Sequence, residues 1–338
     1  GTVTLLFNKY KFEITTLRED VKSHGRHADV SFTDNWLKDS ERRDFTFNAI
    51  YLDRKGNIFD PQSGIKDLNN RTVKFIGDPR RRIEEDYLRI IRFIRFAVQY
   101  DHDFLEPSTV EAIKLNLNGI KNLSKERILK ELLKIIELRN FKNILKNKDL
   151  KEIFSIIFPE FKNLVCINKL DLLPNRDLLN LEPITILGAL LIGESNNHEY
   201  FCHKYKTSKH TENSLNILDN NLKNCRYDKS FFKKNLKKNI YLLGRKSMKD
   251  LALLVFLENK KWQYKELKNL YVSIERTSIP QFPYDGKYLI NKGLREGKKV
   301  GLALKELEKQ WIKSNYRLLD KDASTIIDKF KKSNILDI

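Results

Sequence analysis

Helical periodicity extends over most of this chain and restricts its fold more than any other feature. From residue 78 onward, apolar side chains recur every three or four residues, the spacing that places them on one face of an α-helix. Strand signals nearly disappear over the same stretch. We therefore expect an all-α structure beyond residue 77. The pattern predicts helices over residues 78–100, 107–115, 124–138, 141–145, 148–158, 183–192 and 301–313.

The first 76 residues carry strand signals instead. Residues 1–17 predict a hairpin with a polar turn, and short strands are expected at 58–59 and 72–76. In residues 42–50, polar and apolar side chains alternate, which is the period of a half-buried strand. The chain is therefore predicted to have an α+β fold.

Three polar side chains of the strand predicted over residues 42–50 are candidates for contacts with a nucleotide. Asp44 and Asn48 would share its outward face, opposite the apolar Phe45 and Phe47. An aspartate can accept a hydrogen bond from a ribose hydroxyl, and an asparagine amide can donate one to a phosphate or sugar oxygen. Arg43 could neutralise a phosphate.

The helix predicted over residues 78–100 carries an ordered row of charges. Asp86, Arg89, Arg92 and Arg95 recur every three residues, so they would lie along one side of the helix. A carboxylate can accept from the exocyclic amine of a base, and arginines can donate to base edges or bind a triphosphate. A solvated basic face with ion pairs of about 0.2–0.5 kcal/mol each explains the same pattern. This helix alone leaves both interpretations open.

The charge balance favours a polyanionic partner. The chain has a formal net charge of +19 and a pI near 9.6, which fits nucleic acid or an acidic membrane surface. Lysines interleave with aromatic side chains between residues 204 and 249, as in an RNA-backbone surface or an ordinary solvated helix. No apolar run approaches the length needed to span a bilayer.

The cysteines favour a reducing compartment. Three cysteines at wide spacing do not predict a disulfide framework, and a cytoplasmic protein is the simplest interpretation. Cys202, His203, His210 and Cys225 match no standard zinc spacing. His24 and His27 lie in a polar stretch where solvation is a simpler explanation than metal binding.

Three spaced motifs resemble, in their order, those of the class II tRNA nucleotidyltransferase and bacterial poly(A) polymerase family. They are RRDFTFNA at 42–49, DPQSGIKDL at 60–68 and EEDYLRIIRFIRF at 84–96. The likeness continues upstream through residues 1–20 and downstream in LSKERILKELLKI at 123–135. Among the members of this family, the CCA-adding enzyme is the closer likeness.

The resemblance implies a modular enzyme. It predicts a mixed-sheet head of the polymerase-β nucleotidyltransferase type over 1–76, then a helical neck over 77–140, body over 141–225 and tail over 226–338. The implied reaction is template-independent addition or repair of the 3′-terminal CCA of tRNA from CTP and ATP, with Mg²⁺ as cofactor. The segment at 21–39 is similar to the family's mobile loop, and the segment around Ser124 to one that braces the nucleotide-selecting helix.

The resemblance also assigns roles to individual residues. Asp86 and Arg89 would read the incoming base, and Asp44 would contact the ribose. The triphosphate would be steadied by Arg43, Arg92 and Arg95.

Glu13 is the one metal ligand that the resemblance implies within this chain. It matches the glutamate of an E-x-T-T-[LF] motif, which in the family acts with two aspartates from a preceding strand. The family's glycine-rich segment and Asp-x-Asp pair have no equivalent in this sequence. The resemblance therefore implies an N-terminally truncated chain with an incomplete catalytic metal site.

Three alternatives remain open from the sequence. A poly(A) polymerase shares the head motifs and differs in acceptor and nucleotide use. A partial enzyme could add only C or only A. A noncatalytic RNA-binding fragment would need no metal site. The sequence does not set the oligomeric state.

Overall fold

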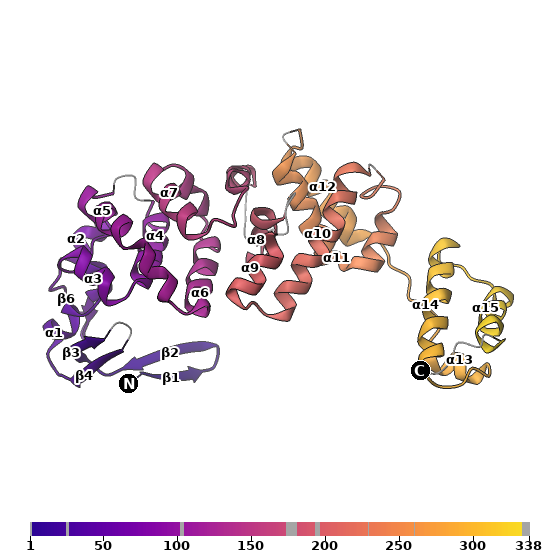
Figure 1. The fold of residues 1–338 in the computed structure, drawn as a ribbon, viewed down its shortest axis with the longest axis horizontal. Coiled ribbons are helices and arrows are strands. Elements are labelled where there is room, and N and C mark those ends of the chain that lie inside the picture. Colours follow the sequence, from indigo (N-terminus) through magenta and orange to yellow (C-terminus); the bar gives the residue numbers. More distant parts are fainter. Residues whose placement is uncertain are drawn as a thin grey trace. The chain divides into compact units, whose positions relative to one another are not determined.

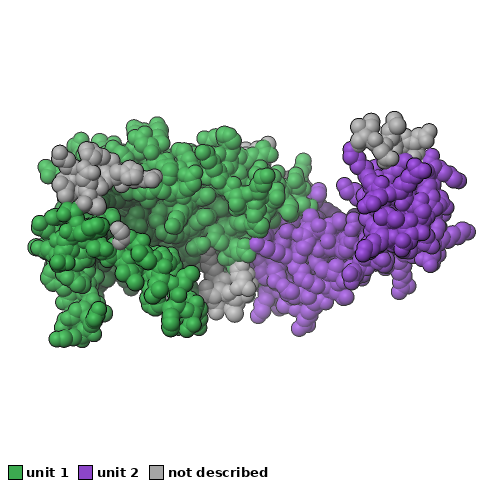
Figure 2. Space-filling model, turned by 90° about the horizontal axis from the view of Figure 1, so that it is seen from below, with its two compact units in different colours: residues 1–223, 253–264 green, residues 224–252, 265–338 purple. Residues whose placement is uncertain are grey.

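The computed structural model describes residues 2–24, 27–101, 105–173, 181–192, 197–228, 230–259 and 261–332. Short strands occupy its N-terminal part and helices follow, so the α+β class is confirmed (Figure 1). The chain forms two compact units, which Figure 2 colours separately. Unit 1 comprises residues 1–223 and 253–264, and unit 2 comprises residues 224–252 and 265–338. Within the described ranges, every helix is too short or too polar to cross a lipid bilayer.

The strands form three two-stranded antiparallel sheets. The hairpin predicted over residues 1–17 is confirmed, with Asn8 in the turn at a φ of 54°. A second hairpin replaces the loop expected over 21–39, because backbone groups from Arg18 to Phe32 pair with one another and Thr33 N donates to Leu17 O at 3.1 Å. The strands are β1 (Thr2–Phe7), β2 (Tyr10–Thr15), β3 (Arg18–His24), β4 (His27–Phe32), β5 (Tyr51–Leu52) and β6 (Ile58–Phe59).

The prediction of a strand over residues 42–50 is wrong. After α1 (Trp36–Glu41), the chain forms one isolated bridge between Phe45 and Phe75 and then a 3₁₀ helix, η1 (Thr46–Ala49). Side-chain hydrogen bonds explain the difference: Asp44 accepts from the neighbouring Phe45 N at 3.0 Å. Thr46 Oγ1 donates to the more distant Asp67 at 2.6 Å. The predicted core face is nevertheless buried, with Phe45 at 0% and Phe47 at 8% exposure.

The DPQSG stretch makes a tight junction with η1. It leads into α2 (Gly64–Asn69), whose first amides, Gly64 N and Ile65 N, donate to the Asp60 carboxylate at 2.7 and 2.9 Å. A Cβ on Gly64 would lie less than 3.0 Å from Thr46 O and Phe47 Cα. Only glycine lets the two backbones approach this closely. The strand expected at 72–76 is reduced to the bridge at Phe75.

The single helix expected over residues 78–100 is two helices. The predicted cap is confirmed, since Asp78 accepts from Arg81 N at 2.9 Å, but α3 (Pro79–Glu85) ends before Asp86, whose backbone is extended (φ −155°, ψ 104°). α4 (Leu88–Gln99) starts afresh, with Leu88 N donating to Asp86 Oδ1 at 3.1 Å. The side chain of Asp86 thus acts at a helix start, where aspartate is favoured over the helix interior.

The other predicted helices are confirmed within a few residues. The helix expected at 301–313 begins at Lys298, and the core helix expected at 183–192 ends at Leu191. After α4 the chain forms the helices α5 (Pro107–Asn116), η2 (Leu117–Asn122), α6 (Lys125–Ile136), η3 (Phe141–Leu145), α7 (Lys148–Ile157), η4 (Leu164–Leu172), α8 (Pro183–Leu191), α9 (Asn197–Tyr205), α10 (Lys209–Tyr227) and α11 (Leu236–Glu258). The remaining helices are α12 (Tyr264–Arg276), α13 (Gly286–Asn291), α14 (Lys298–Lys313) and α15 (Asp320–Lys332).

The core of unit 1 fixes α4 in place. One side of α4 packs against α6, and Ile90, Ile91 and Ile94 on it are fully buried. Its aromatic residues extend this core toward η1, since the ring of Phe93 lies 6.4 Å and that of Phe96 5.4 Å from the ring of Phe45. The arginines of α4 are therefore carried on a helix that is packed against two other elements.

Unit 2 has its own core in its C-terminal part. Helices α13, α14 and α15 enclose a buried apolar cluster. Its fully buried members include Leu289, Ala303, Leu307 and Ala323. The apolar face of α14, expected from the sequence of residues 301–313, is thus buried in this cluster.

Candidate nucleotide-binding site

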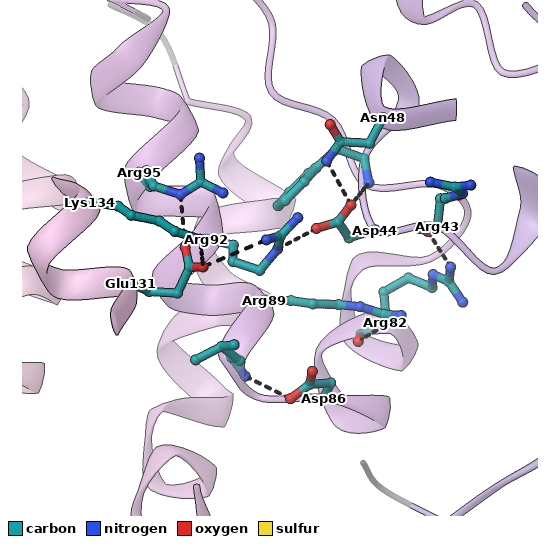
Figure 3. Close-up of polar contacts among 12 residues, drawn as sticks. Arg43, Asp44, Asn48, Arg82, Asp86, Arg89, Arg92, Arg95, Glu131 and Lys134 are labelled. Atoms are coloured by element: carbon teal, nitrogen blue, oxygen red, sulfur yellow. Dashed lines mark hydrogen bonds and ion pairs between the residues drawn. The ribbon is translucent and has the colours of Figure 1, made fainter. Parts of the chain in front are cut away.

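Two distant stretches of sequence meet through one ion pair. Arg92 Nε on α4 donates to Asp44 Oδ2 at 2.6 Å, joining the segment before η1 to the arginine row (Figure 3). The side chain of Asp44 is 11% exposed and that of Arg92 28% exposed. The structure thus brings together the two groups of residues that the sequence predicts as one site.

Asp44 is held by more than its arginine. Its Oδ1 accepts from Asn48 Nδ2 at 2.8 Å and from Phe45 N at 3.0 Å. Burial raises the pKa of Asp44, but the charge of Arg92 and these hydrogen bonds outweigh burial and lower it. Asp44 is therefore ionised at neutral pH. The amide of Asn48, expected to donate to a nucleotide, donates to Asp44 instead.

Glu131 is a member of this network that sequence reasoning missed. It accepts from Arg95 Nε and Lys134 Nζ at 2.8 Å each, and Arg92 Nη1 lies 3.8 Å from it (Figure 3). Its side chain is only 6% exposed. Burial raises the pKa of Glu131, while the hydrogen bond from Lys134 and the charge of Arg95 lower it more. Its position among apolar residues on the buried face of α6 is the signal that could have found it.

Arg89 faces the break between the two helices. Its Nη1 donates to Glu85 Oε2 at 2.5 Å and to Arg82 O at 2.7 Å, and Arg82 Nη1 donates to the same Glu85 oxygen at 2.7 Å. Arg82 also donates to the carbonyl of Arg43 (Figure 3). Arg89 is only 13% exposed, so in this state it joins α3 to α4. Arg82 and Glu85 were absent from the predicted site.

Asp86 lies at the break and pairs with the next helical segment. Arg127 Nη2, at the start of α6, donates to Asp86 Oδ2 at 2.6 Å. The side chains of Asp86 and Arg127 are 24% and 28% exposed. The regular row expected from Asp86 to Arg95 therefore holds only for its three arginines on α4, because Asp86 is in extended backbone.

A buried aspartate that was not predicted positions Arg43. Asp39 is fully buried and accepts from Arg42 Nε and Arg43 Nη2 at 2.9 Å each, and from the Tyr51 hydroxyl at 2.8 Å. Burial raises the pKa of Asp39, but the hydrogen bonds from Tyr51 and the arginines lower it to about 2. Arg43 keeps 34% of its side chain exposed.

The described residues do not form a complete metal site. The Glu13 side chain on β2 is 60% exposed, and Lys11 Nζ donates to it at 2.8 Å, which lowers the pKa of Glu13. In the part of the chain that the structure describes, no three His, Cys, Asp or Glu side chains gather closely enough to bind a metal ion. The zinc candidates Cys202, His203, His210 and Cys225 therefore form no such group among the residues described. The side chains of His24 and His27 lie outside the described residues.

Comparisons with known proteins identify relatives over nearly the whole chain. Residues 1–74 match the family model of the poly(A) polymerase head domain, and residues 104–164 match a model described as the probable RNA and SrmB-binding site of polymerase A. The human mitochondrial CCA tRNA nucleotidyltransferase 1 is 33% identical over 339 residues, covering 94% of this chain and 72% of the relative. The CCA-adding enzyme of Lactobacillus helveticus is 41% identical over 137 residues, 40% of this chain and 34% of the relative.

Solved structures share the fold. The CCA-adding enzyme of Bacillus stearothermophilus in complex with CTP superposes with a TM-score of 0.68 at 20% identity, covering 98% of this chain and 82% of that one. The Thermotoga maritima CCA-adding enzyme, complexed with tRNA, gives a TM-score of 0.54 at 18% identity, with coverages of 93% and 82%.

Proposed function

Because the chain belongs to the CCA tRNA nucleotidyltransferase family, we propose that it adds or repairs the 3′-terminal CCA of tRNA, using CTP and ATP without a nucleic-acid template. The observation that carries this proposal is the charge balance of the network around α4. Seven arginines and Lys134 share five carboxylates there, so positive charge is in excess where a triphosphate would bind.

Asp86 and its neighbours supply the chemistry for choosing C and A. Cytosine and adenine both carry an exocyclic amine beside a ring nitrogen that accepts, whereas uracil and guanine carry a carbonyl there. The Asp86 carboxylate would accept from the amine, and Arg89 would donate to the ring nitrogen. Asp86 keeps acceptor capacity beside its bonds to Arg127 and Leu88 N, because a carboxylate offers about four lone-pair sites.

The phosphates would be bound by Arg43, Arg92 and Arg95, of which the first two are the more exposed. Arg43 and Arg92 expose 34% and 28% of their side chains, and Arg95 exposes 12%. Arg92 and Arg95 share Glu131, so either can turn partly toward a phosphate while the other keeps that carboxylate paired. Asp44 already accepts three hydrogen bonds and would accept one from the ribose at its remaining lone-pair site.

We also retain the division into head, neck, body and tail, and Mg²⁺ as the ion of this metal-dependent family. The head-domain match ends at residue 74, close to the proposed boundary at 76. Glu13 would be one metal ligand, and the other ligands would come from an Asp-x-Asp motif like that of the family. Such an ion supplies charge neutralisation and hydroxyl activation.

We further propose a cytoplasmic location. The three cysteines are buried and unpaired, as is usual in a reducing compartment. Localisation of a tagged protein to an organelle would contradict this location.

The test of the proposed activity uses two proteins and one substrate. One protein is the chain as printed, and the other carries in addition an N-terminal segment with the family's glycine-rich and Asp-x-Asp motifs. Each is incubated with Mg²⁺, labelled CTP or ATP, and tRNA ending before CCA. We expect the extended protein to add C, C and then A, and chelation of Mg²⁺ to stop it.

Other outcomes select the alternatives. Long runs of A from ATP alone would support a poly(A) polymerase, and addition that stops after C or contains only A would support a partial enzyme. If neither protein adds a nucleotide while both bind tRNA, the chain is an RNA-binding module and the proposed function is wrong.

A further inference from the structure

Asp86 and Tyr87 form the break between α3 and α4, and the ring of Tyr87 packs against a glycine. Gly119, in η2, is buried, and a Cβ at this position would lie less than 3.0 Å from three ring carbons of Tyr87. Real Cβ atoms do not approach other atoms so closely. The aromatic ring therefore packs directly on the backbone of η2, and a larger residue at 119 would displace one or the other.

Tyr87 is placed where such a displacement would reach Asp86. It immediately follows Asp86 and is the N-terminal cap residue of α4, with φ −61° and ψ −15°. Asp86 itself is extended, so its carboxylate direction depends on the backbone between α3 and α4. A shift of the Tyr87 ring would turn this backbone, because the next residue is already fixed within α4.

The segment formed by η2 and the start of α6 contacts the break at a second residue, Asp86. Arg127 donates to Asp86 Oδ2 at 2.6 Å from the start of α6, which follows η2 directly. Gly119 thus sets where the ring lies, and Arg127 sets where the carboxylate lies. One short piece of chain supplies both contacts.

We propose that Gly119 and Tyr87 are positioning residues for nucleotide selection. By fixing the break, they would aim Asp86 so that it accepts a hydrogen bond from the amine of CTP or ATP and disfavours UTP. This inference rests on the proposed function, since it takes Asp86 as the group that reads the base. Neither residue needs to touch the nucleotide.

The first test measures nucleotide preference directly. Equilibrium binding of CTP, ATP and UTP is compared for wild type, Gly119→Ala, Tyr87→Phe and Asp86→Asn, each well below its melting temperature. Gly119→Ala should lower the preference for CTP over UTP by about 5- to 150-fold, the range for one base-edge contact, as should Asp86→Asn. Tyr87→Phe keeps the ring and should behave as wild type.

Gly188→Ala in α8 is the matched control for adding a methyl group at a buried glycine. A Cβ there would meet Leu218 Cδ1 at 2.9 Å, the end of a flexible side chain far along the sequence from Asp86. Because this side chain can move aside, we expect a small change in melting temperature and an unchanged nucleotide preference. If Gly119→Ala also keeps its preference, the inference is overturned.

A second measurement separates this inference from the proposed function. The stability cost of Arg127→Gln is determined in the wild-type and Gly119→Ala backgrounds by denaturation. A smaller cost in the Gly119→Ala background supports the positional link, whatever nucleotide the protein binds. Additive costs would show that Gly119 does not position Asp86 against Arg127. Absence of any nucleotide preference in wild type would instead count against the proposed function.

Discussion

Glu131 shows how much the site depends on one buried charge. Its carboxylate accepts from Arg95 and Lys134 with 6% of the side chain exposed. Glu131→Leu leaves two cations without their partner, and we expect the free energy of unfolding of unit 1 to fall by about 3 kcal/mol. Urea denaturation measures this. Glu137→Leu, at an exposed glutamate just after α6, should change stability by no more than about 0.5 kcal/mol.

Asp39 should give unit 1 a distinct pH dependence. Its pKa is lowered from 3.8 to about 2, so the stabilisation is present above pH 3.8 and disappears as pH falls toward 2. A shift of this size corresponds to about 2.5 kcal/mol. We expect Asp39→Asn to be less stable by about this amount at pH 7 and to lack that part of the acid sensitivity. Denaturation from pH 7 to pH 2 tests this, with the exposed Asp34→Asn as control; an unchanged acid profile would contradict it.

At the residue scale, the sequence predicts some members of this charged network but not how they are paired. The spacing of Asp44, Arg92 and Arg95 indicates a charged site, and all three lie in one network. Their partners depend on α6, whose packing against α4 is a tertiary contact that local spacing does not encode. Glu131 could therefore be recognised only as an acid on an apolar helix face.

The junction between η1 and α2 is an element-scale constraint that can be tested. Gly64→Ala would place a Cβ less than 3.0 Å from backbone atoms of Thr46 and Phe47, which cannot move aside as a side chain can. We expect a decrease of about 1–3 kcal/mol in stability. Gly301→Ala in α14, where a Cβ meets nothing within 4 Å, should be neutral or stabilising by up to about 1 kcal/mol. Equal decreases in both variants would contradict this account.

Helices were predicted better than strands for a physical reason. The amphipathic periodicity of α6 and α7 is repeated over several turns, so one exception does not remove the signal. The alternation over residues 42–50 spans few residues, and the side-chain hydrogen bonds of Asp44 and Thr46 were enough to replace a strand with η1. The break at Asp86 went unpredicted because apolar spacing continues across it.

On the scale of the whole molecule, the net charge is distributed unevenly between the units. Unit 2 has 25 Lys and Arg against 12 Asp and Glu, which accounts for +13 of the total of +19. Nine of the 24 residues from 226 to 249 are basic, with Asp228 as the single acid. Binding of tRNA by the proposed function should therefore depend strongly on unit 2 and release counterions there.

Salt dependence tests this distribution of charge. We expect the logarithm of tRNA affinity to fall linearly with the logarithm of salt concentration, measured by filter binding or fluorescence anisotropy. The exposed Lys233, Lys234 and Lys238 are changed to Glu together, and the slope should become shallower by about one for each phosphate that the variant no longer binds. The control changes three exposed lysines of unit 1, residues 55, 66 and 151, to Glu. This control equalises the change in net charge, so an identical change of slope in both triple variants would mean that total charge, rather than a surface on unit 2, attracts the RNA.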